Sequence, residues 1–116
     1  YPIEVELAMR LASGESIVGV TMADIHAMNA AHAAEHATVG KGEAMALLAA
    51  NSAAAANAIR TLSDAQLDAA APASLYGGAP VTCQFVLEDH AVRHSYHHAA
   101  GIRAALQARA LDTVGA

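Results

Sequence analysis

The amino-acid sequence predicts an all-α fold, in which residues 1–116 form a single small helix bundle. Apolar residues recur at spacings of three and four, as in amphipathic helices, and no segment keeps the two-residue alternation of a half-buried strand. Alanine, the residue with the highest helix propensity, supplies much of the 55% apolar content. Aromatic residues make up only 3%, so the helices must approach one another closely to exclude water.

The first predicted helix spans residues 2–11, where three apolar residues recur at four-residue spacing: Ile3, Leu7 and Leu11. Gly14 then provides a C-terminal stop, and residues 15–20, which are interrupted by glycine, indicate a connector. The periodic pattern starts directly after Tyr1 without an upstream cap. We therefore expect the chain to begin partway into a larger protein.

Two longer helices are predicted before the middle of the chain. Thr21 and Asp24 have the spacing of a capping box, and a helix over residues 22–37 should follow them. Gly40 and Gly42 mark the next boundary, because glycine weakens a helix interior, and a further helix should run to about residue 62. Its expected buried stripe consists of Leu48, Ala55, Ile59 and Leu62.

The remaining sequence predicts a turn, an exposed loop and one long helix. Ser63 and Gln66 repeat the capping-box spacing and open a short turn over residues 64–68. Prolines and glycines mark the loop that follows, and residues 81–86 are too isolated to require a strand. The last helix is expected over residues 82–111. Four of its residues should lie along one buried side: Leu87, Ala91, Ile102 and Ala105.

Composition and charge exclude several classes of function. The formal net charge of −5 leaves no positive stripe for phosphates, so we expect no nucleic-acid partner. No run approaches the roughly 20 apolar residues needed to cross a bilayer, so we expect no membrane association. Cys83 has no partner for a disulfide and no secretory signal is evident, which favours a cytoplasmic protein in which Cys83 is a small buried residue.

The last predicted helix carries four of the seven histidines within nine residues: His90, His94, His97 and His98. Residues four apart lie above one another on a helix, so His94 and His98 can direct two imidazoles at one metal ion. Burying both rings without a metal would leave four ring nitrogens to satisfy, at about 1–3 kcal/mol for each group without a partner. We therefore predict His94 and His98 as metal ligands, with His90 and His97 as further ligands, hydrogen-bond partners or proton carriers. The alternative is a set of ordinary buried or exposed histidines.

A second pair of histidines, His32 and His36, brackets Glu35 in the H-x-x-E-H pattern of inverzincin metalloproteases. A protease would also need a downstream acidic ligand and a domain large enough for a substrate cleft, so we do not favour that activity. A bundle can instead bring facing helices together around one ion. On that basis His36 is our candidate for the third metal ligand beside His94 and His98.

Three stretches of the chain resemble a known superfamily. Residues 94–98 followed by Ile102, Arg103 and Ala104 resemble its last helix, residues 62–68 resemble the turn after its third helix, and residues 77–80 resemble the loop before the fourth. On these stretches the chain resembles DinB-like proteins. These are metal-binding four-helix bundles that include thiol-dependent S-transferases and mycothiol-dependent maleylpyruvate isomerase. The resemblance covers residues 1–106.

The resemblance implies a divalent metal, zinc or nickel, held by His94, His98 and one further residue, with an open position for water or a thiolate. It also implies a low-molecular-weight thiol as co-substrate. In the superfamily the third ligand is usually a histidine of the second helix. If residues 3–11 are the end of that helix, this ligand would fall upstream of Tyr1 rather than at His36.

Two functions are compatible with these patterns. The first is a divalent-metal-dependent enzyme, a thiol-dependent S-transferase or isomerase that acts on a small molecule. The second is a non-catalytic helical dimerisation or interaction domain that keeps the histidines as a structural metal site. An open coordination position favours the enzyme, and a site filled by protein ligands favours the interaction domain. We expect a homodimer in either case, because a short bundle with exposed apolar faces is stabilised by association.

Overall fold

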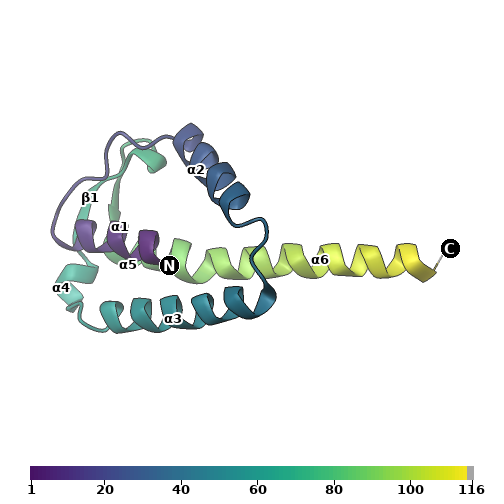
Figure 1. The fold of residues 1–116 in the computed structure, drawn as a ribbon. Helices are drawn as coiled ribbons and strands as arrows, with labels where there is room; N and C mark the ends of the chain where they lie inside the picture. The colour runs from purple at the N-terminus through teal and green to yellow at the C-terminus, as the bar shows by residue number, and fades with distance from the viewer. Residues whose placement is uncertain (115–116) are drawn as a thin grey trace.

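Helices account for most of the chain, of which the computed structural model describes residues 1–114, with the side chains of residues 1–110 (Figure 1). The main helices are α1 (Pro2–Ala12), α2 (Met22–Glu35), α3 (Lys41–Ile59) and α6 (His94–Val114). The shorter elements are α4 (Asp64–Leu67), β1 (Ala70–Pro72), η1 (Ser74–Tyr76), β2 (Pro80–Thr82), α5 (Cys83–Val86) and the π-helical η2 (Leu87–Arg93). The last three helical elements follow one another without a break.

Local capping signals place the helices close to their predicted bounds. The Thr21 hydroxyl accepts a hydrogen bond from the Asp24 backbone N–H at 3.2 Å, and the Asp24 carboxylate accepts one from the Thr21 N–H at 2.8 Å. The Thr21 hydroxyl also donates to the Asp24 carboxylate at 2.6 Å, and this bond, followed by the one from the Thr21 N–H, lowers the pKa of the Asp24 carboxyl group. Ser63 and Gln66 form the second predicted capping box. Gly14, with φ +77, follows α1 in the left-handed conformation that glycine tolerates. The predicted helix boundaries in the first half of the chain are thus confirmed to within a few residues.

A two-stranded antiparallel sheet replaces the loop expected between residues 69 and 82. β1 and β2 pair with Ala71 opposite Val81, and Ile17 of the connector adds a parallel bridge to Ala73. The Ile17 N–H donates to the Pro72 carbonyl at 2.9 Å. The expectation of a chain without strands was wrong here, because three-residue strands are too short to show an alternating pattern and their pairing is non-local.

The hydrophobic core lies at one end of the molecule, where α1, α5 and the start of η2 meet the small sheet. Leu11 and Cys83 are 0% exposed, which confirms the prediction that Cys83 is buried. The other buried members of this cluster are Ala8, Ile17, Ala71, Ala73, Val86 and Leu87. Partly buried side chains of α3 and of the residues after it, Ile59 and Leu62, close the core from one side.

Two of the predicted buried stripes extend beyond this core. Ala55 and Leu87 are buried, but Leu48 is 50% exposed, Ile102 is 62% exposed and Ala105 is also exposed, so the expected burial of these three residues was wrong. The reason is visible in Figure 1, where the C-terminal half of α6 projects past the other elements and α2 stands apart from α3 and α6. Helical periodicity identifies an apolar face but not whether another element covers it.

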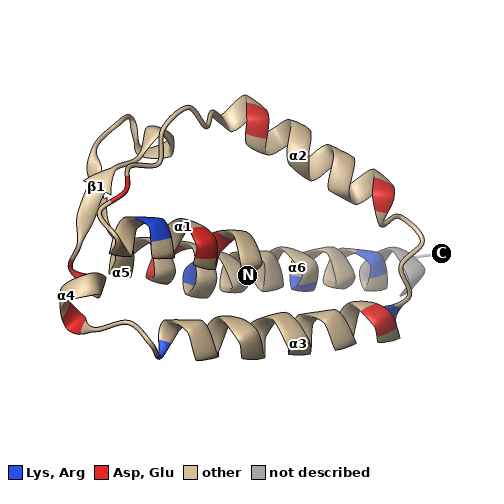
Figure 2. Cartoon of the chain, turned by 60° about the vertical axis from the view of Figure 1, so that its left-hand side comes forward, with Lys and Arg blue, Asp and Glu red and all other residues tan. Residues whose placement is uncertain are grey.

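The outline of the molecule is elongated, with principal extents of 57 × 29 × 25 Å. α2 contributes no buried residue. Charged residues are distributed along the elements rather than gathered into one stripe (Figure 2). None of the helices in the described part of the chain combines the length and the apolar character that a bilayer crossing requires.

Candidate metal centre on the long helix

The histidine cluster lies on a helix that begins at a well-defined cap. The Thr82 hydroxyl accepts a hydrogen bond from the Phe85 N–H at 3.0 Å and starts α5. Burial of Cys83, Val86 and Leu87 then anchors this end of the helix in the core. The chain continues through the π-helical η2 into α6, and π-helical turns are frequent at functional sites. The first turns of α6 therefore present their side chains at a fixed place beside the core.

His94 and His98 are brought together at the start of α6. Their Nε2 atoms are 2.7 Å apart and their ring centroids are 4.4 Å apart, with the ring planes at 70°. A contact between two ring nitrogens requires one of them to carry a proton, so the pair shares one N–H. Both side chains are exposed. The four-residue spacing thus places two Nε2 atoms at a single point on the surface of the helix.

His90 precedes His94 by the same four residues but belongs to a different contact. Its Nε2 lies 2.7 Å from the Tyr76 hydroxyl oxygen, and its ring centroid is 6.2 Å from that of His94. The π-helical turn between His90 and His94 and the bond to Tyr76 explain the wider separation. His90 is therefore a neighbour of the pair rather than a part of it.

His97 lies beside the pair, with its ring centroid 6.3 Å from that of His94 and 5.6 Å from that of His98. Together with Asp89, Arg93 and His94 it lines an open depression of about 260 Å³. The Arg93 guanidinium forms an ion pair with Asp89, four residues earlier. A small molecule in this depression would contact two imidazoles and one guanidinium.

Tyr76 and Asp89 form a polar link that the sequence analysis did not identify. The Tyr76 hydroxyl donates a hydrogen bond to Asp89 Oδ2 at 3.0 Å, in addition to its contact with His90. Partial burial, followed by the bond to Asp89, raises the pKa of Tyr76 to about 12. The only sequence signal was an isolated tyrosine before Gly77 and Gly78, which does not reveal a partner thirteen residues later.

His36, the candidate third ligand, lies at the C-terminal cap of α2. Its ring centroid is 4.4 Å from that of His32, and its Nε2 is 4.0 Å from a carboxylate oxygen of Glu35. It lines a separate depression between α2 and α3, with Val39 and Leu47 among the other lining residues. Within the described part of the chain, no three His, Cys, Asp or Glu side chains are grouped to hold one ion. The role of His36 as third ligand stays a prediction.

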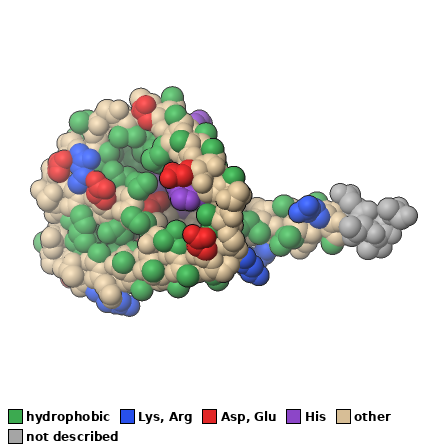
Figure 3. All heavy atoms as spheres, viewed as in Figure 1, with side chains coloured by type: hydrophobic (Ala, Val, Ile, Leu, Met, Phe, Trp, Pro, Cys, Tyr) green, Lys and Arg blue, Asp and Glu red, His purple; other side chains and the backbone are tan. Residues whose placement is uncertain are grey.

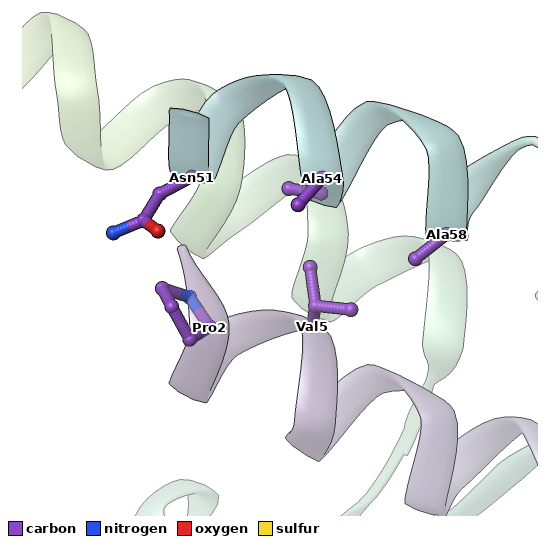
Figure 4. A pocket seen from close by; sticks show the side chains of 6 residues that line it. Pro2, Val5, Asn51, Ala54 and Ala58 are labelled. Atoms are coloured by element: carbon purple, nitrogen blue, oxygen red, sulfur yellow. The ribbon is translucent and has the colours of Figure 1, made fainter. Parts of the chain in front are cut away.

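A smaller depression separates α1 from α3 (Figure 4). Pro2 and Val5 of α1 face Ala54 and Ala58 of α3 across it, and Asn51 supplies its one polar side chain. Apolar lining with a single amide offers no group for acid–base or metal chemistry. This depression therefore offers less for chemistry than the histidine cluster at the start of α6.

The sequence matches no known protein-family profile, no curated protein and no solved structure.

Proposed function

We propose that this chain is a helical interaction domain that binds a divalent metal ion, zinc or nickel, through His94 and His98. The observation that carries this proposal is the 2.7 Å separation of the two Nε2 atoms on one exposed helix face. Imidazole nitrogens bind zinc at about 2.0–2.1 Å, which places two tetrahedral ligands about 3.3 Å apart. A small rotation of the two rings gives that separation, so an ion can take the place of the shared proton.

Proton and metal compete for the same lone pairs in this arrangement. In the metal-free pair one ring carries its proton on Nε2, whereas metal binding requires both rings to carry it on Nδ1. Neither Nδ1 atom has to leave a tertiary contact for this change, since the two side chains are exposed. The rearrangement is local to α6 and leaves the core untouched.

Exposure of apolar residues supports an interaction role in preference to a catalytic one. Ile102 and Leu106 are 62% and 60% exposed on the projecting part of α6, and Leu47 is 58% exposed on α3. Large apolar side chains that lie together on a surface are typical of a contact with another protein. A metal at His94 and His98 would then help to fix the geometry of that contact.

A metal-dependent enzyme of the DinB-like type is the second candidate, and the depression beside the pair favours it. A bound ion would supply a Lewis acid that lowers the pKa of a water or thiol ligand. Arg93, held by Asp89, would orient an anionic group of a small substrate or thiol, and His97 would accept or donate a proton at its ring nitrogen. Thiol-dependent transfer or isomerisation is the reaction class that the resemblance implies.

Metal binding can be tested on the purified chain by elemental analysis and by calorimetric titration with zinc and with nickel after treatment with a chelator. We expect the wild type to bind metal and the His94→Ala, His98→Ala double variant to lose it. His26→Ala, which removes an exposed histidine of α2, is the matched control. Equal binding by the wild type and the double variant would refute the proposal. Weaker binding by His36→Ala would add His36 to the ligand set.

A further inference from the structure

We infer that the His94–His98 pair is one half of a metal site that a second copy of this chain completes across a two-fold axis. The inference rests on the proposed metal binding and names the partner. Two imidazoles from each copy would supply four nitrogen ligands, the number that structural zinc sites contain. A two-fold axis brings the same patch of both copies together, so a single pair per chain is sufficient.

His90 and Asp89, which lie near the pair, are committed to other contacts. His90 is held by the Tyr76 hydroxyl at 2.7 Å, and both carboxylate oxygens of Asp89 are engaged, one by Tyr76 and the other by Arg93. His97 lies beside the pair, with its ring centroid 6.3 Å from that of His94 and 5.6 Å from that of His98, but no three potential ligands in the described part of the chain are grouped around one point. Two further protein ligands are therefore best supplied from outside the chain.

The position of the pair on α6 leaves room for a second copy. Every described side chain from Ala100 to Ala110 is exposed, so no element in the described part of the chain buries this face. The helical spacing that aligns His94 and His98 continues through small residues on the same side: Gly101, Ala105 and Ala108. Ile102 flanks this side and is 62% exposed. No charged side chain lies on this side between His94 and Ala108.

An antiparallel crossing of two α6 helices at the histidines would also cover the projecting half of each helix. This half extends past the other elements in Figure 1, and Figure 3 shows hydrophobic side chains exposed along it. In such a crossing it would run beside the other copy's η2 and the depression lined by Asp89, Arg93 and His97. The apolar contact and the metal site would form together.

The oligomeric state with and without metal tests this inference. Light scattering coupled to size-exclusion chromatography should report a monomer in the presence of a chelator and a dimer after addition of zinc chloride. Elemental analysis of the dimer should give about one zinc ion per two chains, because each chain supplies two of four ligands. His94→Ala, His98→Ala should stay monomeric in zinc, whereas the His26→Ala control should dimerise.

A second variant tests the helix face independently of the ligands. Ile102→Glu places a charge on an exposed position beside the pair and should weaken zinc-dependent dimerisation without loss of helix content by circular dichroism. A monomer that binds about one zinc ion per chain would overturn the shared site and leave the proposed metal binding intact. A dimer that persists in chelator and in the double variant would also overturn it. Absence of zinc binding would overturn both proposals.

Discussion

The phenol oxygen of Tyr76 lies 2.7 Å from Nε2 of His90, and this contact joins the turn between β1 and β2 to the π-helical η2. Asp89 strengthens the link, because its carboxylate accepts a hydrogen bond from the Tyr76 hydroxyl and forms an ion pair with the Arg93 guanidinium. The small sheet therefore holds the segment that directly precedes His94. The position of the histidine pair depends on this contact as well as on the helix itself.

Tyr76 should make folding stability depend on alkaline pH. Its pKa is raised from 10.0 to about 12 in the folded chain, so the unfolded state loses the phenolic proton first. The stabilisation that comes with the protonated phenol is complete below pH 10 and is lost as the pH rises toward about 12. Urea denaturation across this range should show a decline for the wild type that is reduced in Tyr76→Phe.

Tyr96→Phe is the control for this experiment, because it also removes a phenol hydroxyl, from a side chain of α6 that is 73% exposed. It should keep the wild-type decline. The same decline in Tyr76→Phe as in the wild type would show that the Tyr76 phenol does not govern it.

Leu11 should be among the residues to which stability is most sensitive. It is 0% exposed in a core that contains few large side chains, and Leu→Ala changes at buried sites cost about 2–5 kcal/mol. Leu11→Ala should therefore lower the free energy of unfolding, measured by urea denaturation, by an amount in that range. Leu47→Ala, at a position 58% exposed, should change it by less than about 0.5 kcal/mol. Similar losses for both variants would contradict the position of the core.

Two glycines should respond to alanine in opposite directions. Gly77 ends η1 with φ +67, a conformation that costs an L-residue roughly 1–2 kcal/mol, so Gly77→Ala should destabilise the fold. Gly42 lies in the first turn of α3, where an added Cβ meets no atom within 4 Å. Gly42→Ala should stabilise the chain by up to about 1 kcal/mol through helix propensity. Thermal unfolding of the two variants checks the signs, and a gain for Gly77→Ala would contradict the turn geometry.

The thiol of Cys83 should be unreactive in the folded chain. Burial raises the pKa of its thiol, and the side chain is 0% exposed, so a thiol reagent should react slowly in buffer and rapidly in urea. Cys83→Ser should cost about 1–3 kcal/mol, because it places a hydroxyl among apolar neighbours. Cys83→Ala, which adds no polar group, is the control. Rapid reaction of the native thiol would show that the first turn of α5 opens readily.

Local signals in the sequence determined where the main helices form and that the imidazoles of His94 and His98 lie close together. The Thr21 and Asp24 capping box, the stop at Gly14 and the four-residue spacing of His94 and His98 all act within one or two helical turns. Interactions over so few residues depend on local backbone geometry and on the side chains at those positions, and they can therefore be identified without knowledge of the rest of the fold.

Tertiary structure alone decided which apolar faces are covered and which polar groups meet. Leu11 and Leu48 both belong to helical apolar patterns, yet one is buried and the other is half exposed, because Leu11 lies in the core cluster where α1 meets the sheet and α5, whereas Leu48 lies outside that cluster. The Tyr76 contacts with Asp89 and His90, like the pairing of β1 with β2, join segments whose meeting depends on the packing of the whole core. Burial and long-range hydrogen bonds each require two surfaces of the protein in contact. A sequence pattern describes only one of the two surfaces, so it cannot identify the partner.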